Sequence, residues 1–584
     1  MSGIGVVWDI AKDALSTSRF GIDVTGHNIA NVNTAGYSRQ STVQEAKHPM
    51  FFNGLQLGRG VTTSQVVRET DQFIENRLMQ QGSNLAYSTE MENYIHILEG
   101  VFNENSDASV SSLLNQYWSL WHDVANNPLG ASERIALYEL SSLISERFQY
   151  LDGEMRQLKT DLSNVLGPAI NRINQITNEI ANLNNEIVGL ESNNVANDLR
   201  DKRNILVSEL SQYIDTNSFE QDNGSLTIVS ARGCVLVHSN TSYSISLGGA
   251  NGDRVEWSSS AGSKIDMTDY ITNGKLGGWL DVRDEVLEKY SLDLDSMTRE
   301  FIWATNQQHS QGVGLEAFNG VTASYAAASA TDAMGTAASG LTFFDKIQDG
   351  NFQLWVYDSN GDVVTPGGDT ITIDADTTRL TDVAAQIGAA DANITAAVID
   401  GRLEISAANG YTFAFGGDNS NTLAALGINT FFEGSTAGGM DVCDAIRDNF
   451  NLIAAGRIDA TGVFATGDNA NAVAITDLQF ATMDIPNWSC DRIDGNTPGS
   501  ITASVGDYYR AFVGSLGTIS ESLTRERAFD EVSASKIGEI RDSLSAVSLD
   551  EEMTNLMKFQ HAYTAAAKLI TTADEMLATL LELK

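Results

Sequence analysis

The sequence predicts an α+β multidomain protein in which discontinuous helical coiled-coil termini and a helical trunk carry inserted β-rich outer domains. Three observations lead to this fold class. The chain has 584 residues, which is more than one hydrophobic core usually organises. Both ends lack proline and carry apolar residues at helical spacing. The middle is rich in Gly, Ala, Ser, Thr and Asp, in short alternating runs that are typical of strands and hairpins.

The first terminal helix is predicted by a heptad seam. Its members alternate spacings of four and three, and they are Ile4, Trp8, Ala11, Leu15, Ser18, Ile22, Thr25 and Ile29. The seam ends in a stretch rich in Asn, from Asn28 to Gly36. Because Asn and Gly tolerate the left-handed conformation that ends a helix, we expect the chain to turn there.

The last helix is predicted to begin at a capping box formed by Ser548 and Glu551. Its seam repeats the same spacing through Leu549, Met553, Leu556, Gln560, Tyr563, Ala567, Ile570, Asp574, Leu577 and Leu581, and drifts onto Phe559, Ala566, Ala573 and Leu580. An apolar stripe usually packs on its own domain. These two end helices are long, weakly charged and short of obvious partners in the chain, so we expect other subunits to supply their packing.

The predicted assembly interface therefore draws on both end helices. Its residues are Ile4, Trp8, Ala11, Leu15, Ile22, Ile29, Leu549, Met553, Leu556, Tyr563, Ile570, Leu577 and Leu580.

The trunk is predicted from a helical region at 132–214 and shorter helical patterns at 72–99, 279–308 and 505–545. The long seam slips by one residue at Gly167-Pro168, where we expect a kink or a break. Hairpin turns are expected at Asn360-Gly361 and Asp400-Gly401. The predicted domains are a terminal coiled coil (1–50 with 545–584), a trunk (51–215 with 270–312 and 500–544) and β-rich outer parts (216–269 and 313–499).

The charge of the chain excludes several partners. With 36 basic and 76 acidic residues its net charge is −40, so nucleic acid and anionic membrane surfaces are not expected to bind. No apolar run approaches the ~18 residues that cross a bilayer. The start lacks a basic region before its apolar stretch and carries Asp9 within it, so we expect no cleaved signal peptide.

Catalytic and metal-binding patterns are missing from the sequence. It contains no phosphate-binding loop, no zinc-protease motif and no nucleophile elbow. The cysteines are Cys234, Cys443 and Cys490, with no Cys-x-x-Cys pair. The run from Asp358 to Asp362 resembles the start of a calcium loop, but Val363 stands where that loop needs glycine, and a plain hairpin explains it better. We expect no cofactor, no metal and no enzymatic activity.

Residues Thr25 to Gln40 resemble the N-terminal signature of the flagellar rod, hook and hook-associated protein family. The shared residues are Asn28, Ile29, Ala30, Asn31, Val32, Asn33, Thr34, Gly36 and Tyr37. Ala35 replaces a proline of the signature, which should leave the turn intact. The stretch Ser548–Tyr563 is similar to the closing helix of the hook-associated members, and Asn197–Arg203 is similar to their Asp-Leu-Arg-Asp segment.

The resemblance implies a structural subunit at the hook–filament junction. Such proteins leave the cell unfolded through the flagellar type III export channel, and their terminal helices pair as a coiled coil that lines the inner wall of a tube. The implied partners are copies of itself, the hook protein, the neighbouring junction protein, the filament and a cytoplasmic export chaperone. The alternatives are another axial subunit, such as a hook or filament protein, and a surface enzyme carried on an axial scaffold.

Overall fold

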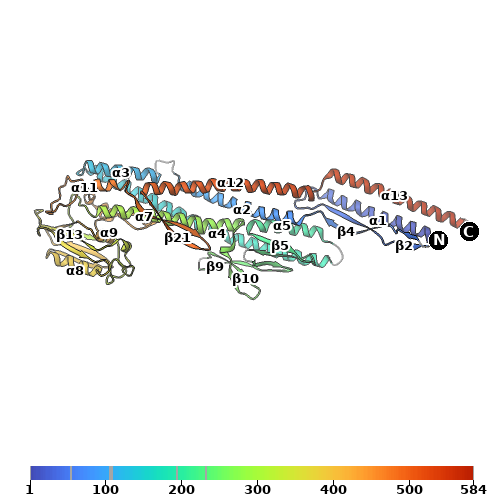
Figure 1. The fold of residues 1–584 in the computed structure, drawn as a ribbon, viewed down its shortest axis with the longest axis horizontal. Coiled ribbons are helices and arrows are strands. Elements are labelled where there is room, and N and C mark those ends of the chain that lie inside the picture. Colours follow the sequence, from blue (N-terminus) through green and yellow to red (C-terminus); the bar gives the residue numbers. More distant parts are fainter. Residues whose placement is uncertain are drawn as a thin grey trace. The chain divides into compact units, whose positions relative to one another are not determined.

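The structure is a computed structural model that describes residues 2–52, 55–103, 109–191, 195–230, 233–250 and 252–582, with the side chains of all of these except residues 2–4, 52, 55, 580 and 582. It combines long helices with small antiparallel sheets, which confirms the predicted α+β class (Figure 1). Two compact units are present, each built from separate stretches. The first comprises residues 1–94, 161–282 and 521–584, and the second comprises 95–160 and 283–520.

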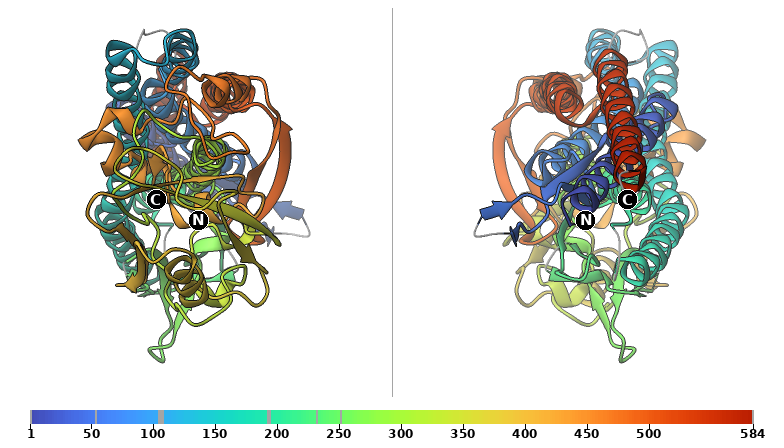
Figure 2. Two further views of the ribbon diagram at one scale, coloured as in Figure 1. Left: turned by 90° about the vertical axis from the view of Figure 1, so that its left-hand side faces the viewer. Right: turned by 90° about the vertical axis from the view of Figure 1, so that its right-hand side faces the viewer.

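The two terminal helices lie side by side in the first unit. They are α1 (Ser2–Ala30) and α13 (Leu549–Glu582), and they run together in Figure 1 and in the right-hand view of Figure 2. The chain turns after α1, as the Asn-rich stretch predicts, and Gly36 takes a positive φ of 73°. A side chain on this glycine would be strained, and its Cβ would lie 2.5 Å from Cγ1 of Ile205.

A β-rich arm, residues 40–68, follows the turn and was not predicted. Its outer strands β1 (Gln40–Ala46) and β4 (Val61–Arg68) pair antiparallel, and β2 (Met50–Phe52) pairs with β3 (Leu55–Leu57) at its tip. The arm is held on α1 by an ion pair of 2.6 Å between Lys47 Nζ and Asp13 Oδ2. Gly60 also approaches α1, and a Cβ there would lie 3.3 Å from the Cα of Ile10.

Long helices make up much of the remaining chain. They are α2 (Gln72–Val101), α4 (Ala131–Leu190), α5 (Asn197–Tyr213) and α12 (Val505–Ser545), and the chain also contains the short helix α6 (Gly274–Asp281). The helix α4 continues through Pro168, so the kink or break expected at Gly167-Pro168 does not end it. The residues around the proline, Leu166, Ala169 and Ile170, are all buried, and this packing outweighs the hydrogen bond that proline removes. None of the described helices is both long and apolar enough to cross a membrane.

Two small sheets of the first unit pack beside α4. One has the order β5 (Thr216–Glu220), β6 (Leu226–Ser230), β7 (Val235–His238), β8 (Thr241–Ser242), and the other has β11 (Lys264–Asp266), β10 (Arg254–Ser258), β9 (Ile245–Gly248). Asparagines of α4 hold both sheets. Asn184 exchanges two hydrogen bonds with the backbone of Leu226, at 2.8 and 3.0 Å. Asn174 does the same with Ile245, at 2.8 and 2.9 Å.

The second unit surrounds α3 (Val110–Asn126) and α7 (Leu287–His309), the latter preceded by a π-helical turn (Val282–Val286). Its short helices are α8 (Leu380–Ala390), α9 (Thr422–Leu426), α10 (Asp444–Asp448) and α11 (Ala470–Asp477). Its strands are β12 (Gly320–Thr322), β13 (Gly350–Tyr357), β14 (Asp369–Ile373), β15 (Ile394–Ile399), β16 (Arg402–Ala407), β17 (Thr412–Gly416), β18 (Phe432–Glu433), β19 (Asp441–Val442), β20 (Met483–Asp491) and β21 (Gly495–Ala503).

An aromatic core joins the helices of the second unit to its β-rich part. Trp121 of α3 lies 5.4 Å, between ring centroids, from Phe431, and Tyr117 lies 5.5 Å from Phe301 of α7. The hairpin β20–β21 lies against α7, where the Trp488 N–H donates to Oδ1 of Asp293 at 2.7 Å. Phe431 and the β20–β21 hairpin therefore pack on the helices of this unit.

The two predicted hairpin turns are present. Asp400-Gly401 connects the paired strands β15 and β16. Asn360-Gly361 lies in a turn whose ends are bridged by Tyr357 and Val363. In that turn Asp358 Oδ1 accepts backbone hydrogen bonds from Asn360 and Asp362, so this carboxylate is engaged by the hairpin itself.

Candidate assembly interface

The seam between α1 and α13 is built mainly from small and polar residues, with Phe559 as its one large aromatic member among the described positions. On α1 the buried positions along this face are Ala11, Ser18, Gly21, Thr25 and Asn28. On α13 the facing positions recur every seven residues, at Glu552, Phe559, Ala566 and Ala573. A Cβ on Gly21 would lie 2.6 Å from the ring of Phe559. The two helices therefore approach closely at Gly21, which leaves room for the Phe559 ring.

The larger residues of the predicted interface lie outside this seam. Ala11 is buried within it, and Leu15, Ile22, Ile29, Leu556, Ile570 and Leu577 are half-buried. Trp8, Leu549, Met553 and Tyr563 are exposed. The side chains of Ile4 and Leu580 are outside the described part of the structure. The apolar heptads thus have small members buried between the two helices, large members that are half-buried, and other large members that are exposed.

An exposed stripe begins at the first turn of α13. It consists of Leu549, Met553 and Met557, which follow one another at intervals of four and are 49%, 52% and 52% exposed. Residues at this spacing form one helix face. Unbranched methionine adapts to irregular partner surfaces, which favours its use where one protein contacts another. The exposed stripe is one of the apolar surfaces that the helix pair leaves in water.

Asn28 of the signature joins three segments at one buried point. Its Nδ2 donates to the Gln40 carbonyl at 2.9 Å and to Glu552 Oε2 at 3.0 Å. Its Oδ1 accepts from the Tyr37 hydroxyl at 2.7 Å and from the Gln40 N–H at 3.0 Å. All donor and acceptor sites of the amide are thus used, which binds the end of α1 to the arm and to α13.

Arg39 completes the link to α13. Its guanidinium pairs with Glu552 Oε1 at 2.9 Å and with Glu551 Oε2 at 2.8 Å. The backbone N–H of Arg39 donates to the carbonyl of Ser545, the last residue of α12, at 2.8 Å. Glu552 is almost fully buried. A buried carboxylate is costly unless it is paired, and Glu552 has both the arginine and the Asn28 amide as partners.

The Asp-Leu-Arg-Asp segment of α5 meets the signature from the other side. Asp201 accepts from the Ser38 N–H at 3.0 Å and pairs with Arg68 at 2.8 Å. Asp198 accepts from the Gln40 side chain at 2.8 Å. Two stretches that the family resemblance marks separately are therefore parts of one polar cluster.

Tyr37 lies among these acidic groups. Burial raises the pKa of its hydroxyl strongly, and the carboxylates of Asp198, Asp201 and Glu552 raise this pKa further. The hydroxyl therefore stays protonated and keeps its hydrogen bond to Asn28. Its role in the cluster is that of a donor.

The remaining signature residues divide into turn formers and exposed positions. Asn31 donates to the His27 carbonyl at 3.0 Å, and Gly36 supplies the positive φ. Ala30 and Asn33 are exposed.

Sequence reasoning missed Glu552 as a member of the cluster. The sequence did contain a signal for it, because Glu552 is an acidic residue seven positions before Phe559 on an otherwise apolar helix face.

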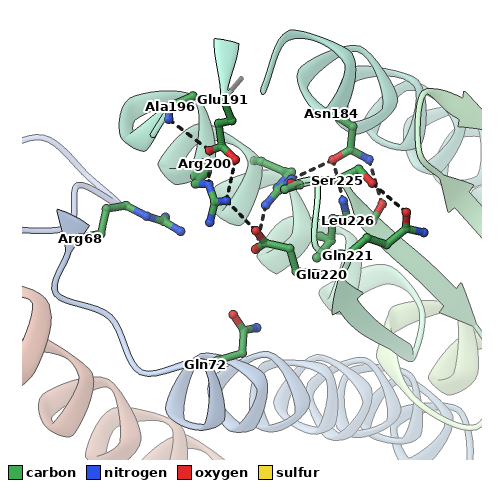
Figure 3. A network of polar contacts seen from close by, with 12 residues as sticks. Arg68, Gln72, Asn184, Glu191, Ala196, Arg200, Glu220, Gln221, Ser225 and Leu226 are labelled. Atoms are coloured by element: carbon green, nitrogen blue, oxygen red, sulfur yellow. Dashed lines mark hydrogen bonds and ion pairs between the residues drawn. The ribbon is translucent and has the colours of Figure 1, made fainter. Parts of the chain in front are cut away.

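A second polar cluster fixes α5 to the neighbouring sheet (Figure 3). Arg200 lies between Glu191 and Glu220, with contacts of 2.6 and 2.7 Å. Arg203 donates to Asn184 Oδ1 at 2.9 Å and to the Gly224 carbonyl at 2.7 Å. These bonds hold α5 in the position from which Asp198 and Asp201 reach the signature.

In the described part of the chain, no three His, Cys, Asp or Glu side chains group as metal ligands.

Comparison with known families gives two matches. Residues 95–322 match the family model described as the flagellar hook-associated protein FlgK helical domain. Residues 542–583 match the model described as the flagellar basal body rod FlgEFG protein C-terminal. The second match contains the start of α13 and the exposed stripe.

Curated relatives are similar over nearly the whole chain. Flagellar hook-associated protein 1 of Bacillus subtilis is 26% identical, over 97% of this chain and 96% of its own length. The proteins of the same name from Escherichia coli and Salmonella typhimurium are 26% and 24% identical, each over 98% of this chain and 99% of its own length. The solved flagellar hook junction protein FlgK of Burkholderia pseudomallei matches the fold with a TM-score of 0.52 at 16% identity, over 81% of this chain and 100% of that one.

Proposed function

The chain belongs to the flagellar hook-associated protein family, and on this premise we propose that its paired terminal helices make the contacts between copies at the hook–filament junction. It is a structural component of the bacterial flagellum, as its relatives are by name. The observation that carries the proposal is the exposed stripe Leu549, Met553, Met557 on a helix pair whose own seam is already filled.

Leaving the stripe exposed to water is unfavourable in free energy. Burying a methionine or leucine side chain yields about 1.5–3 kcal/mol, so three such residues favour association by several kcal/mol for each contact made. In a tube each copy makes that contact, and the gain is repeated around and along the wall. Trp8 and Phe20 are further exposed apolar side chains on α1. One face of each helix is thus buried in the pair, and other faces are available to neighbouring copies.

The polar cluster around Asn28 serves this function by fixing the pair. It acts together with the Phe559 ring, which packs on Gly21, to set the register of a seam that is otherwise made of small and polar side chains. A slip of one turn would displace the stripe by about 5.4 Å. The signature therefore acts by positioning the stripe, while the stripe makes the contact.

The proposed partners are further copies of this chain, the hook protein, the neighbouring junction protein and the filament. The proposed location is outside the cell, reached through the flagellar export channel. A cytoplasmic export chaperone would cover the C-terminal stripe before export, because an exposed apolar surface of this kind promotes premature association. We propose no catalytic activity, since the named relatives are structural proteins.

Electron microscopy of cells that lack the gene tests the proposal. We expect complete hooks without filaments, with filament protein released into the medium. Expression of the wild-type chain should restore filaments. Normal filaments in the deletion strain would contradict the proposed function, whereas loss of the hook as well would indicate an earlier axial role.

A further inference from the structure

The strand β5 forms one edge of its sheet in the first unit. The order of that sheet is β5, β6, β7, β8, so β5 has β6 on one side and no described strand on the other. Natural proteins often protect such an edge with proline or lysine, and β5 contains neither. Its free edge is therefore chemically open to a further strand.

The hydrogen bonds of β6 show which residues of β5 face this free edge. Leu226 lies opposite Glu220, and both its N–H and its carbonyl bond to the side chain of Asn184 instead of to β5. These two residues therefore exchange no hydrogen bond, and such pairs alternate along an antiparallel ladder. By the same alternation Thr216 and Ser218 direct their N–H and carbonyl groups towards the free edge.

A cavity of about 590 Å³ lies along this edge, within the first unit. It is lined by residues 216–218 of β5, by the face of α2 between Phe73 and Asn84, and by single residues of neighbouring segments. Three strand residues span about 10 Å, and ligand sites commonly measure ~300–1,000 Å³. The side chain of Phe73 is 69% exposed, so this wall of the cavity is open to solvent.

The lining of the cavity is polar but carries no net charge. It contains one basic and one acidic residue, Arg77 and Asp215, and otherwise consists mainly of amide and hydroxyl side chains. The hydroxyl of Ser83 is buried and makes no hydrogen bond among the described residues, which is unfavourable unless a ligand supplies the partner. Several lining amides also make no side-chain hydrogen bond with any described residue, namely Gln80, Asn84, Asn217 and Asn273.

These groups together fit an extended polypeptide. A guest strand can bond to the backbone of Thr216 and Ser218, as strands do when they add to an exposed sheet edge. The amides both donate and accept, which suits the backbone and the polar side chains of the guest. The lining offers no excess of charge to offset the cost of taking a charged guest side chain out of water, so the guest should be uncharged.

We propose that the cavity beside β5 binds an extended, uncharged polypeptide segment of a neighbouring axial subunit, which adds a strand to the free edge of β5. The inference rests on the proposed function for the source of this segment, because that function supplies the neighbouring subunits. The contact is made mainly by backbone groups and is thus separate from the apolar stripe on α13.

Replacing Ser218 with proline tests the added strand directly. Because the Ser218 N–H points to the free edge, proline removes a donor to the guest and leaves the bonds between β5 and β6 in place. Ser218→Val is the matched control, since it keeps the N–H and suits a strand. Both purified variants should melt like the wild-type chain.

The probe for binding is a phage-displayed library of random heptapeptides, panned on the purified wild-type chain. We expect enriched peptides that are poor in charged residues and bind Ser218→Val like the wild type. They should bind Ser218→Pro about tenfold more weakly, and methylation of alternate backbone nitrogens in such a peptide should weaken its binding similarly. No enrichment, or equal binding to the wild type and Ser218→Pro, would overturn the added strand. Binding of maltohexaose in place of peptides would make this a saccharide site and overturn it too.

Filament counts in a strain that lacks the chromosomal gene test the source of the segment. Ser218→Pro should lower the number of filaments per cell about tenfold, in proportion to the weaker binding, and Ser218→Val should leave it unchanged. Normal filaments with Ser218→Pro, although peptides bind the wild type, would overturn the assignment to an axial subunit. Failure of the proposed function shows itself differently, as normal filaments in the deletion strain itself.

A second variant covers the case in which Ser218→Pro lowers the melting temperature. Asn84→Leu removes a lining amide from α2 and leaves the strands untouched. Weaker peptide binding with unchanged melting would support the proposal, and peptide binding equal to that of the wild type would overturn it.

Discussion

Asn28 Nδ2 on α1 donates a hydrogen bond to Glu552 Oε2 on α13 at 3.0 Å, joining residues 524 positions apart. Both side chains are almost fully buried. Together with the Phe559 ring, which packs on Gly21, the bond sets the register of two helices whose seam is otherwise made mostly of small residues. It therefore determines which residues of α13 remain exposed, and this is how the signature influences a surface that it does not itself form.

Replacing Asn28 with aspartate should break this link. The new carboxylate cannot donate to Glu552 or to the Gln40 carbonyl, and it places a second negative charge beside a buried glutamate. We expect the free energy of unfolding of the first unit to fall by about 3–5 kcal/mol. Denaturant unfolding measures this loss. Asn33→Asp, at an exposed position of the same turn, should change it little, and equal losses in the two variants would refute the role of Asn28.

Two glycines of α1 should respond to alanine with opposite signs. At Gly26 a Cβ would meet nothing within 4 Å, so Gly26→Ala should stabilise the helix by about 1 kcal/mol through helix propensity. At Gly21 a Cβ would lie 2.6 Å from Phe559, so Gly21→Ala should destabilise by about 1–2 kcal/mol. Adding Phe559→Ala to the Gly21 variant should remove the clash penalty, as a double-mutant cycle in thermal melting can measure. Stabilisation at both glycines would mean that the helices are not in close contact.

The second unit should lose stability in mild acid through His309. Its Nδ1 donates to the Asn429 carbonyl at 2.8 Å and its Nε2 accepts from the Ala454 N–H at 2.9 Å, which fixes the neutral ring. Burial lowers the pKa of His309 to about 4, below its unfolded value of 6.5. The unfolded state therefore binds more protons between these two pH values.

The histidine contribution to stability should be complete above pH 6.5 and should fall by about 3 kcal/mol as the pH drops towards 4. Measuring denaturant unfolding of the wild type and His309→Gln across this range isolates the effect, because other groups titrate in both proteins. The difference in stability between them should shrink as the pH falls. A constant difference would contradict the assignment.

Arg203 should contribute more to the stability of the first unit than an exposed charged residue does. It is almost fully buried and donates to Asn184, to Gly224 and to Glu220. Arg203→Met should lower the free energy of unfolding of the first unit by about 3 kcal/mol, because it leaves buried acceptors without donors. Arg525→Met, at an exposed ion pair, should cost less than about 1 kcal/mol. Similar small losses in both variants would show that the cluster in Figure 3 contributes little.

The sequence predicted the long helices well because their apolar period is local information. It also placed the turn after α1 and the Asp400-Gly401 hairpin. Ser18 and Thr25 are the polar members of the N-terminal seam, yet they are buried on the face of α1 that meets α13, because close helix contact favours small side chains. Only the identity of the facing helix could reveal this. Glu552 as the partner of Asn28 and the continuation of α4 through Pro168 likewise depend on tertiary contacts that no local pattern records.

The central claim is that the exposed stripe on α13 joins copies, and Met553 tests it most directly. Met553 is 52% exposed in the isolated chain, so Met553→Asp should leave the melting of the purified protein unchanged. In a junction it would bury an unpaired carboxylate, at a cost of several kcal/mol per contact. Met553→Leu keeps the apolar volume and serves as the control.

The decisive measurement is the number of filaments per cell by electron microscopy, in the deletion strain that expresses each variant. The account predicts normal filaments with Met553→Leu. With Met553→Asp it predicts bare hooks, although the variant protein is exported and melts like the wild type. Normal filaments with Met553→Asp would contradict the claim that this stripe is the assembly interface.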